Sequence, residues 1–174
     1  MPARAFIGIG SNIAPEAHIR RALQELAKRV ALIGLSTFYR TTPLGPDTQP
    51  PFINGVAAVR TDLAPRTMKF TLLRGIEAAL GRVRGDNKYA PRTIDLDLLL
   101  YDELLIAEEG LVLPDPDIPR RPFLALPLCE LEAGLRLPGS GVYLAELAAA
   151  LPHTEMEALP RLTQSLRKEF SHES

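Results

Sequence analysis

The sequence predicts an α+β fold in which strands and helices follow the order β-α-β-β-α-β, with a hairpin and short helices after it. Two observations support this prediction. Short apolar runs that end at turn residues alternate with segments whose apolar residues recur at helical spacing. The chain has 174 residues and an apolar fraction of 46%, which fits one globular domain with a sizeable core.

The elements are assigned from the start of the chain. Strands are predicted at residues 5–10, 30–39, 52–61 and 94–101, helices at 17–29, 65–80, 122–130 and 143–151, and a small hairpin at 104–106 and 111–113. Pro65 suits the first position of the second helix, and Gly81 caps its end. Residues 40–51 hold four prolines, too many for regular structure, so this segment is predicted to be a stiff loop.

This order of elements is typical of the ferredoxin-like fold, and we expect three layers with helices on both faces of the sheet. The sequence is interpreted as a single domain over residues 1–174. Its core is expected at about residues 4–151, and residues 155–174 are expected to be a C-terminal tail that forms a frayed helix.

The composition of the chain argues against several classes of protein function. The net charge of −1 argues against a general nucleic-acid or membrane surface, so any charge that binds phosphate must be local. The one cysteine, Cys129, excludes an internal disulfide and fits a reducing compartment. The sequence shows neither a signal peptide nor a membrane-length apolar run. We therefore predict a cytoplasmic protein, and a monomer, that binds small molecules.

Two acids on the strand at 94–101 are the first candidate site. Asp95 and Asp97 are two positions apart, so their side chains point to the same side with Cα atoms about 6.6–7 Å apart. Two parallel carboxylates repel each other and are costly to desolvate without a cation. Mg²⁺ prefers oxygen ligands of this kind. The alternative is that one aspartate pairs with an arginine while the other is solvated.

A basic loop precedes these acids. Arg82, Arg84 and Arg92 surround a Gly-Asp-Asn turn, and guanidinium groups match phosphate oxygens with two donors each. A basic loop that leads into an acidic strand predicts a site for a polyphosphate and its metal. A solvated charged loop is the alternative, and loop charge alone does not exclude it.

The motifs around this site resemble those of the 6-hydroxymethyl-7,8-dihydropterin pyrophosphokinase family of folate biosynthesis. The run PRTIDLDLLLYD, preceded by LGRVR, matches every fixed position of that family's signature. FIGIGSN resembles its first strand and turn, and FYRTTPLG with PPFINGV resembles its pterin loop and following strand. The resemblance covers about residues 4–130.

The resemblance implies the same fold and a transferase that uses ATP with two Mg²⁺ ions. The pterin's hydroxymethyl oxygen would attack the β-phosphorus of ATP, and AMP would leave. It implies the following roles: catalytic, Arg82 and Arg92; metal-binding, Asp95 and Asp97; ATP-binding, Glu77, Arg84, Tyr89 and Arg121; pterin-binding, Thr41, Thr42, Leu44, Phe52, Asn54 and Phe123.

The chemistry of three of the predicted pterin-binding residues also suits a flat heterocycle. A flat heterocycle is bound well by aromatic faces, for which Phe52 and Phe123 are candidates. The Asn54 amide can both donate and accept at the ring edge. Core packing is the alternative for the two phenylalanines. Asparagine is a poor strand former, so Asn54 is harder to explain without a ligand.

One departure leaves a second function open. Asp115 stands where the family commonly has a histidine near the nucleotide, and a carboxylate there would repel triphosphate unless it points away. A catalytically silent member that only binds pterin or nucleotide is therefore the alternative function. A P-loop kinase is excluded because the chain has no Gly-Lys pair, and the strands lack the aromatic stripe of an RNA-binding module.

Overall fold

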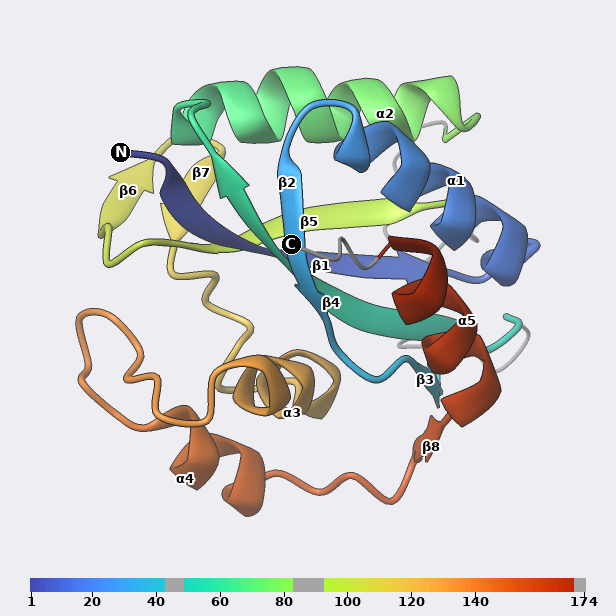
Figure 1. Cartoon of the computed structure of the whole chain (residues 1–174). Coiled ribbons are helices and arrows are strands. Elements are labelled where there is room, and N and C mark those ends of the chain that lie inside the picture. Colours follow the sequence, from blue (N-terminus) through green and yellow to red (C-terminus); the bar gives the residue numbers. More distant parts are fainter. Residues whose placement is uncertain (43–48, 83–92, 171–174) are drawn as a thin grey trace.

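A computed structural model describes residues 1–42, 49–82 and 93–170 of the chain. Six strands form the main sheet in the order β5-β1-β4-β3-β8, and β2 also pairs with β4 (Figure 1). The strands are β1 (Ala3–Ser11), β2 (Ala31–Leu35), β3 (Tyr39–Thr41), β4 (Phe52–Thr61), β5 (Asp95–Tyr101) and β8 (Met156–Ala158). All the pairs are antiparallel, which confirms the predicted ferredoxin-like order.

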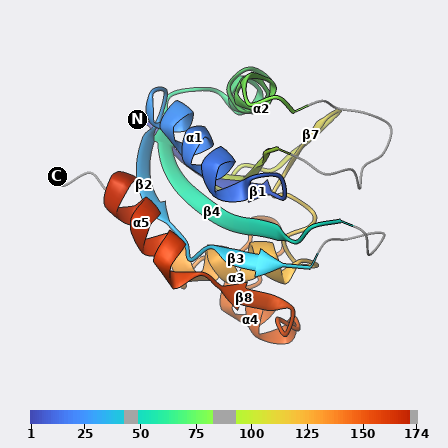
Figure 2. The same ribbon diagram turned by 90° about the vertical axis from the view of Figure 1, so that its right-hand side faces the viewer.

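Helices cover both faces of this sheet, so the predicted three layers are present (Figures 1 and 2). The helices are α1 (Pro15–Ala27), the π-helix η1 (Thr67–Leu73), α2 (Arg74–Ala79), α3 (Pro122–Leu131), α4 (Leu144–Ala150) and α5 (Pro160–Phe170). The segments η1 and α2 together replace the single helix expected at 65–80. Gly81 follows them with φ +85°, as its predicted capping role requires.

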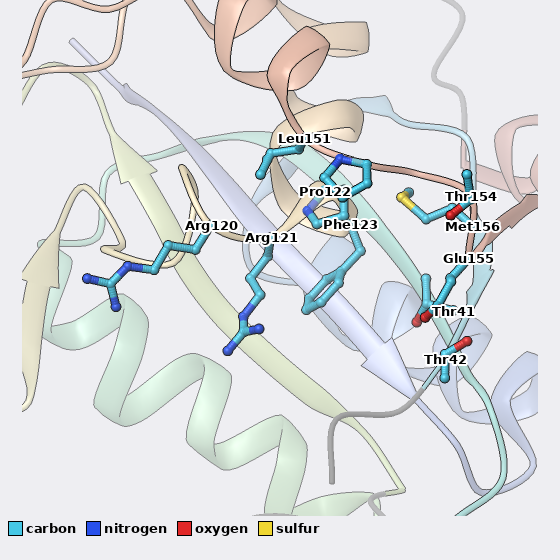
Figure 3. Close-up of a pocket in the computed structure, with 11 residues that line it drawn as sticks. Thr41, Thr42, Arg120, Arg121, Pro122, Phe123, Leu151, Thr154, Glu155 and Met156 are labelled. Carbon is cyan, nitrogen blue, oxygen red and sulfur yellow. The ribbon is translucent and has the colours of Figure 1, made fainter. Parts of the chain in front are cut away.

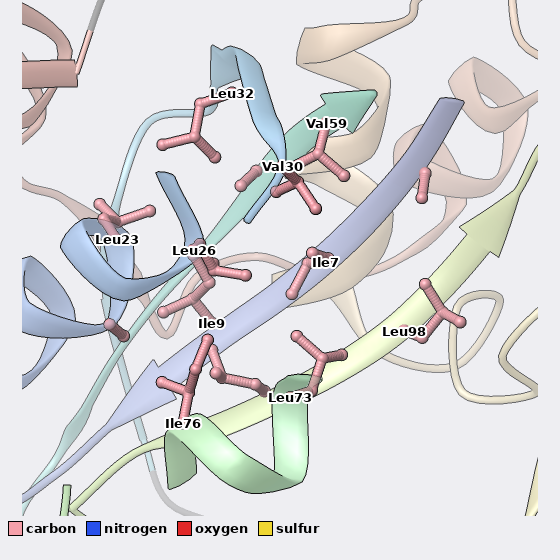
Figure 4. Packing of buried hydrophobic residues seen from close by; sticks show 14 of the residues in the cluster. Ile7, Ile9, Leu23, Leu26, Val30, Leu32, Val59, Leu73, Ile76 and Leu98 are labelled. Atoms are coloured by element: carbon pink, nitrogen blue, oxygen red, sulfur yellow. The ribbon is translucent and has the colours of Figure 1, made fainter. Parts of the chain in front are cut away.

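The strict alternation of β1 divides the core between the two faces. Ile7 and Ile9 pack with Leu23 and Leu26 of α1 and with Ile76 of α2 (Figure 4). On the other face, the residues that pack against α3 and α4 belong to a second cluster, which includes Phe6, Val56, Leu99, Leu124, Leu128 and Leu144. The candidate residues of β4, β5 and α3 described below lie on this second face, at the end of the sheet near the start of α3.

The single strand expected at 30–39 is divided into β2 and β3. The register with β4 shifts between Leu32 and Gly34, and Ser36 then interrupts the regular ladder. The Ser36 backbone N–H donates to the Val56 carbonyl at 2.9 Å, and the Val56 N–H donates to the Ser36 hydroxyl at 2.8 Å. A side-chain hydroxyl thus replaces one backbone acceptor and bends the strand.

The hairpin lies near its expected place. It consists of β6 (Ile106–Glu108) and β7 (Leu111–Leu113), so its first strand begins two residues later than predicted. Gly110 supplies the turn with φ +76°. No helix among the described residues is long and apolar enough to cross a membrane.

The C-terminal segment corrects the expectation of a tail. Residues 156–170 form β8 and α5, which pack against the rest of the domain, and residues 171–174 lie outside the described residues. Leu162 and Leu166 are buried in the first core cluster. The Phe38 N–H donates to the Thr163 hydroxyl at 2.9 Å, so α5 also completes the backbone bonding between β2 and β3.

Removing a buried side chain of α5 tests this packing. Leu166 is fully buried, so Leu166→Ala is expected to lower the free energy of unfolding by about 2–5 kcal/mol. Gln164→Ala, on the exposed side of the same helix, is expected to change it by less than about 0.5 kcal/mol. Urea titration of both variants measures the difference. Equal and small effects would mean that α5 does not contribute to the core.

Candidate active site

Three neighbouring strands bring the candidate residues into one row. Gly10 of β1 lies directly opposite Asn54 of β4 on one side and opposite Asp95 of β5 on the other. Gly8 is likewise opposite Asp97. Directly opposed residues project to the same face of a sheet, so the amide and both carboxylates share a face. Residues of this row and Phe123 line a small cavity of about 40 Å³.

β5 places its two acids here because its other face is apolar. Ile94, Leu96 and Leu98 are buried in the first core cluster, as their alternation predicts. Asp95 is partly buried and Asp97 is exposed on the opposite face. The core therefore fixes which way the carboxylates point, because a slip of one residue would bury both acids.

A buried ion-pair network lies beside Asp95. One guanidinium nitrogen of Arg82, Nη1, is 2.7 Å from Asp95 Oδ1 and 2.5 Å from Glu77 Oε2. The Glu77 side chain is only 3% exposed and also accepts the Leu96 N–H at 3.0 Å. Burial alone would lower the pKa of Arg82, but the carboxylates of Asp95, Glu77 and Asp97 raise it. Arg82 therefore stays charged next to the acids of β5.

One alternative to a metal site was that one aspartate pairs with an arginine while the other is solvated. Asp95 does pair with Arg82, so this part of the alternative is present. Glu77 is not the exposed helical acid that was the alternative for this residue: its carboxylate is buried and pairs with Arg82. The sequence did not predict this pairing. The metal and nucleotide roles of these residues remain predictions.

Asp97 has more negative than positive charges near it. Desolvation raises the pKa of its carboxyl group well above the usual range, as do the charges of Asp95, Asp115 and Glu77, while Arg82 opposes them. A cation beside Asp97 would relieve this repulsion, so the acids fit a divalent metal.

The donor set limits how such a metal is held. No group of three or more histidine, cysteine, aspartate or glutamate side chains able to hold a metal occurs among residues 1–42, 49–82 and 93–170. A cation at Asp95 and Asp97 would need further oxygen ligands from substrate or water, which is usual for Mg²⁺.

The Asn54 amide is held in place from β3. Asn54 Nδ2 donates to the Thr41 hydroxyl at 2.6 Å, and Asn54 is opposite Tyr39 in the β3–β4 pair. Phe52 begins β4 two residues earlier and therefore projects to the same face. Phe123 sits in the first turn of α3 and lines the cavity beside Asn54. The structure thus brings Thr41, Phe52, Asn54 and Phe123 together.

A larger cavity of about 370 Å³ adjoins this group. Figure 3 shows Phe123 projecting from the start of α3, with Arg121 on one side and Thr41 and Thr42 on the other. Residues near the C-terminus form the remaining wall: Leu151, Pro152, Thr154, Glu155 and Met156. Sequence reasoning missed this wall, because a three-residue strand carries no recognisable period.

Asp115 lies close enough to act on the acids. Its N–H donates to the Leu99 carbonyl at 2.9 Å, which holds it beside β5. Burial raises the pKa of the Asp115 carboxyl, as do Asp117 and Asp95, whereas the Asp117 N–H and Lys69 lower it. Asp115 therefore adds negative charge beside the two acids of β5.

Four predicted residues fall outside the part of the chain that the structure describes: Leu44, Arg84, Tyr89 and Arg92. Their predicted roles rest on the sequence alone.

Comparison with known proteins identifies the family of this chain. Residues 6–133 match the family described as 7,8-dihydro-6-hydroxymethylpterin-pyrophosphokinase (HPPK). The chain is 42% identical over 163 residues to a 2-amino-4-hydroxy-6-hydroxymethyldihydropteridine pyrophosphokinase of Pseudomonas aeruginosa, covering 92% of this chain and 99% of that one. The enzyme of the same name from Haemophilus influenzae is 38% identical over 141 residues, covering 79% and 87%.

Solved structures agree at the level of the fold. The crystal structure of a Plasmodium falciparum HPPK-DHPS triple mutant superposes with a TM-score of 0.69 at 14% identity, over 86% of this chain and 44% of that one. This chain therefore spans less than half of that solved chain. The family match and the two bacterial relatives carry more weight, and on their evidence the chain belongs to the 7,8-dihydro-6-hydroxymethylpterin pyrophosphokinase family.

Proposed function

We propose that this chain transfers a diphosphate group from ATP to 6-hydroxymethyl-7,8-dihydropterin at the cavity between β1, β4, β5 and α3. The products are AMP and the pterin diphosphate, an intermediate of folate biosynthesis. Two bacterial relatives are named for this activity, and this chain matches most of their length. The observation that carries the proposal is the row in which Asn54, Gly10 and Asp95 share one face of the sheet.

The pterin occupies the Asn54 end of the row. Its ring lies between Phe52 and Phe123, and its polar edge bonds to the Asn54 amide, whose orientation Thr41 fixes. Thr41 and Thr42 bound the ring on the β3 side. Leu44 is proposed to contact the ring on the evidence of the sequence motif alone. This arrangement leaves the hydroxymethyl group facing the acids of β5.

The nucleotide occupies the acid end. Asp95 and Asp97 would hold Mg²⁺, two ions in the full complex, and the metal would neutralise and orient the triphosphate. Arg121, at the start of α3, and Glu77, which pairs with Arg82, are the described residues proposed to contact ATP. Arg84 and Tyr89 are proposed to contact ATP on the evidence of the sequence motif alone.

Arg82 and Arg92 stabilise charge on the transferred group. Arg82 is already placed by two carboxylates, so it loses little side-chain entropy when a phosphate arrives. The protein contributes positioning and electrostatics rather than a covalent intermediate. We further propose that the enzyme acts as a cytoplasmic monomer on small molecules, without nucleic-acid or membrane partners, a view that its net charge of −1 supports.

A direct assay tests the reaction and Arg82 together. The unaltered protein with ATP, Mg²⁺ and 6-hydroxymethyl-7,8-dihydropterin is expected to form AMP and pterin diphosphate. Arg82→Ala is expected to reduce turnover by about 10³-fold, as for arginines that stabilise a transferred phosphoryl group, and to weaken pterin binding far less.

The two results have separate meanings. Turnover by Arg82→Ala within about threefold of the parent would remove this residue from the catalytic set. A parent that binds both substrates but forms no AMP would instead be the silent family member, for which the carboxylate of Asp115 is the structural reason.

The metal assignment is tested at Asp97. Asp97→Asn removes one of the two charges that attract the cation, so Mg²⁺-dependent binding of ATP is expected to disappear in titration calorimetry. Asp62→Asn, at an exposed acid outside the site, is the matched control and should bind as the parent does. Unchanged ATP affinity in Asp97→Asn would refute the metal role.

The role of Glu77 in holding Arg82 is tested through stability. Glu77→Ala leaves the Leu96 N–H and part of the Arg82 guanidinium without their buried acceptor, so the free energy of unfolding should fall by at least about 2 kcal/mol. Glu157→Ala removes an exposed ion pair with Arg40 and should cost less than about 1 kcal/mol. Similar losses in the two variants would show that the buried pair has no special importance.

A further inference from the structure

Gly10 occupies the middle of the row that joins the two ends of the site. Neighbouring strands are about 4.8 Å apart, so the Cα atoms of Asn54 and Asp95 lie about 10 Å from each other with Gly10 between them. A side chain on Gly10 would project to the same face as the amide and the carboxylate. Gly10 therefore places no side chain between the amide and the carboxylate.

The space above Gly10 is already used by Asn54. A Cβ atom on Gly10 would lie 2.5 Å from Asn54 Oδ1 and 3.6 Å from Asn54 Cγ, and 3.8 Å from Phe52 Cδ1. Contacts of 2.5 Å do not occur between such atoms, so the amide would have to move. The same overlap arises whichever way round the amide is placed.

Backbone conformation does not explain this glycine. The glycines with positive φ in the described part of the chain are at positions 81, 110, 139 and 141, so Gly10 has a backbone that other residues can adopt. Gly8, two residues earlier on the same face, would place a Cβ 3.4 Å from Leu99, an ordinary contact. Of the two β1 glycines on this face, only Gly10 therefore needs the space that a side chain would fill.

The amide cannot move without loss. Its Nδ2 donates to the Thr41 hydroxyl at 2.6 Å, and this bond holds it between β3 and β1. A methyl group on β1 would push the amide away from the sheet and break this bond. It would also occupy the gap that leads from Asn54 to Asp95.

We propose that Gly10 is a positioning residue for the pterin. Its missing side chain lets the Asn54 amide lie against β1 and keeps the gap toward Asp95 open for the hydroxymethyl side of the ring. This inference rests on the proposed function, because it assigns the amide end of the row to the pterin. It predicts a selective effect on the pterin and not a general loss of binding.

Titration calorimetry of Gly10→Ala tests this role with each substrate separately. The Kd for 6-hydroxymethyl-7,8-dihydropterin is expected to rise at least tenfold, while the Kd for ATP with Mg²⁺ stays within threefold. In an Asn54→Ala background, the same substitution is expected to change the pterin Kd by less than threefold, because the displaced amide is then absent. Equal changes for both substrates, no change for the pterin, or fully additive effects would overturn the proposal.

Two further variants separate positioning from folding. Gly55→Ala would place a Cβ 2.6 Å from the Phe38 ring, in the core on the opposite face, so it shows what a comparable clash does to both affinities through stability alone. If Gly10→Ala does not fold, the double variant Gly10→Ala with Asn54→Ala should recover folding. Failure of the double variant would also overturn the proposal. A parent protein that does not bind the pterin would instead refute the proposed function itself.

Discussion

The charge balance around Glu77 is the constraint on which the site depends. A carboxylate in α2 that is only 3% exposed is costly unless a cation and hydrogen-bond donors surround it. Arg82 supplies the cation and the Leu96 N–H supplies a donor. This arrangement links the end of α2 to β5, and it brings the guanidinium to Asp95 before any substrate binds.

The same strand joins this charge network to the core. Leu96 donates its backbone N–H to Glu77 while its side chain is buried between the sheet and the helices. Asp95 and Asp97 then have only the other face available to them. The burial of the apolar side chains of β5 therefore also fixes the direction of its two acids. A substitution that weakens this packing would also disturb the position of the acids.

Much of this could be predicted from local sequence. The bounds of β4 and the alternation of β5 follow from short-range patterns, and so does the cap at Gly81. The ion pair between Glu77 and Arg82 could not be predicted, because it depends on how η1 and α2 approach the start of β5. The division of the strand at Ser36 and the packing of α5 also depend on partners distant in sequence, Val56 and Phe38.

The two ends of the site come from different parts of the chain, one of them from the C-terminal segment. β8 places Met156 opposite Thr41, so a strand outside the family match at residues 6–133 forms a wall of the larger cavity. The acids of β5 and the row through Gly10 lie within that match. A change in residues 151–156 can therefore alter the shape of the cavity next to Phe123 while the carboxylates keep their place, since only the wall depends on the register of β8 with β3.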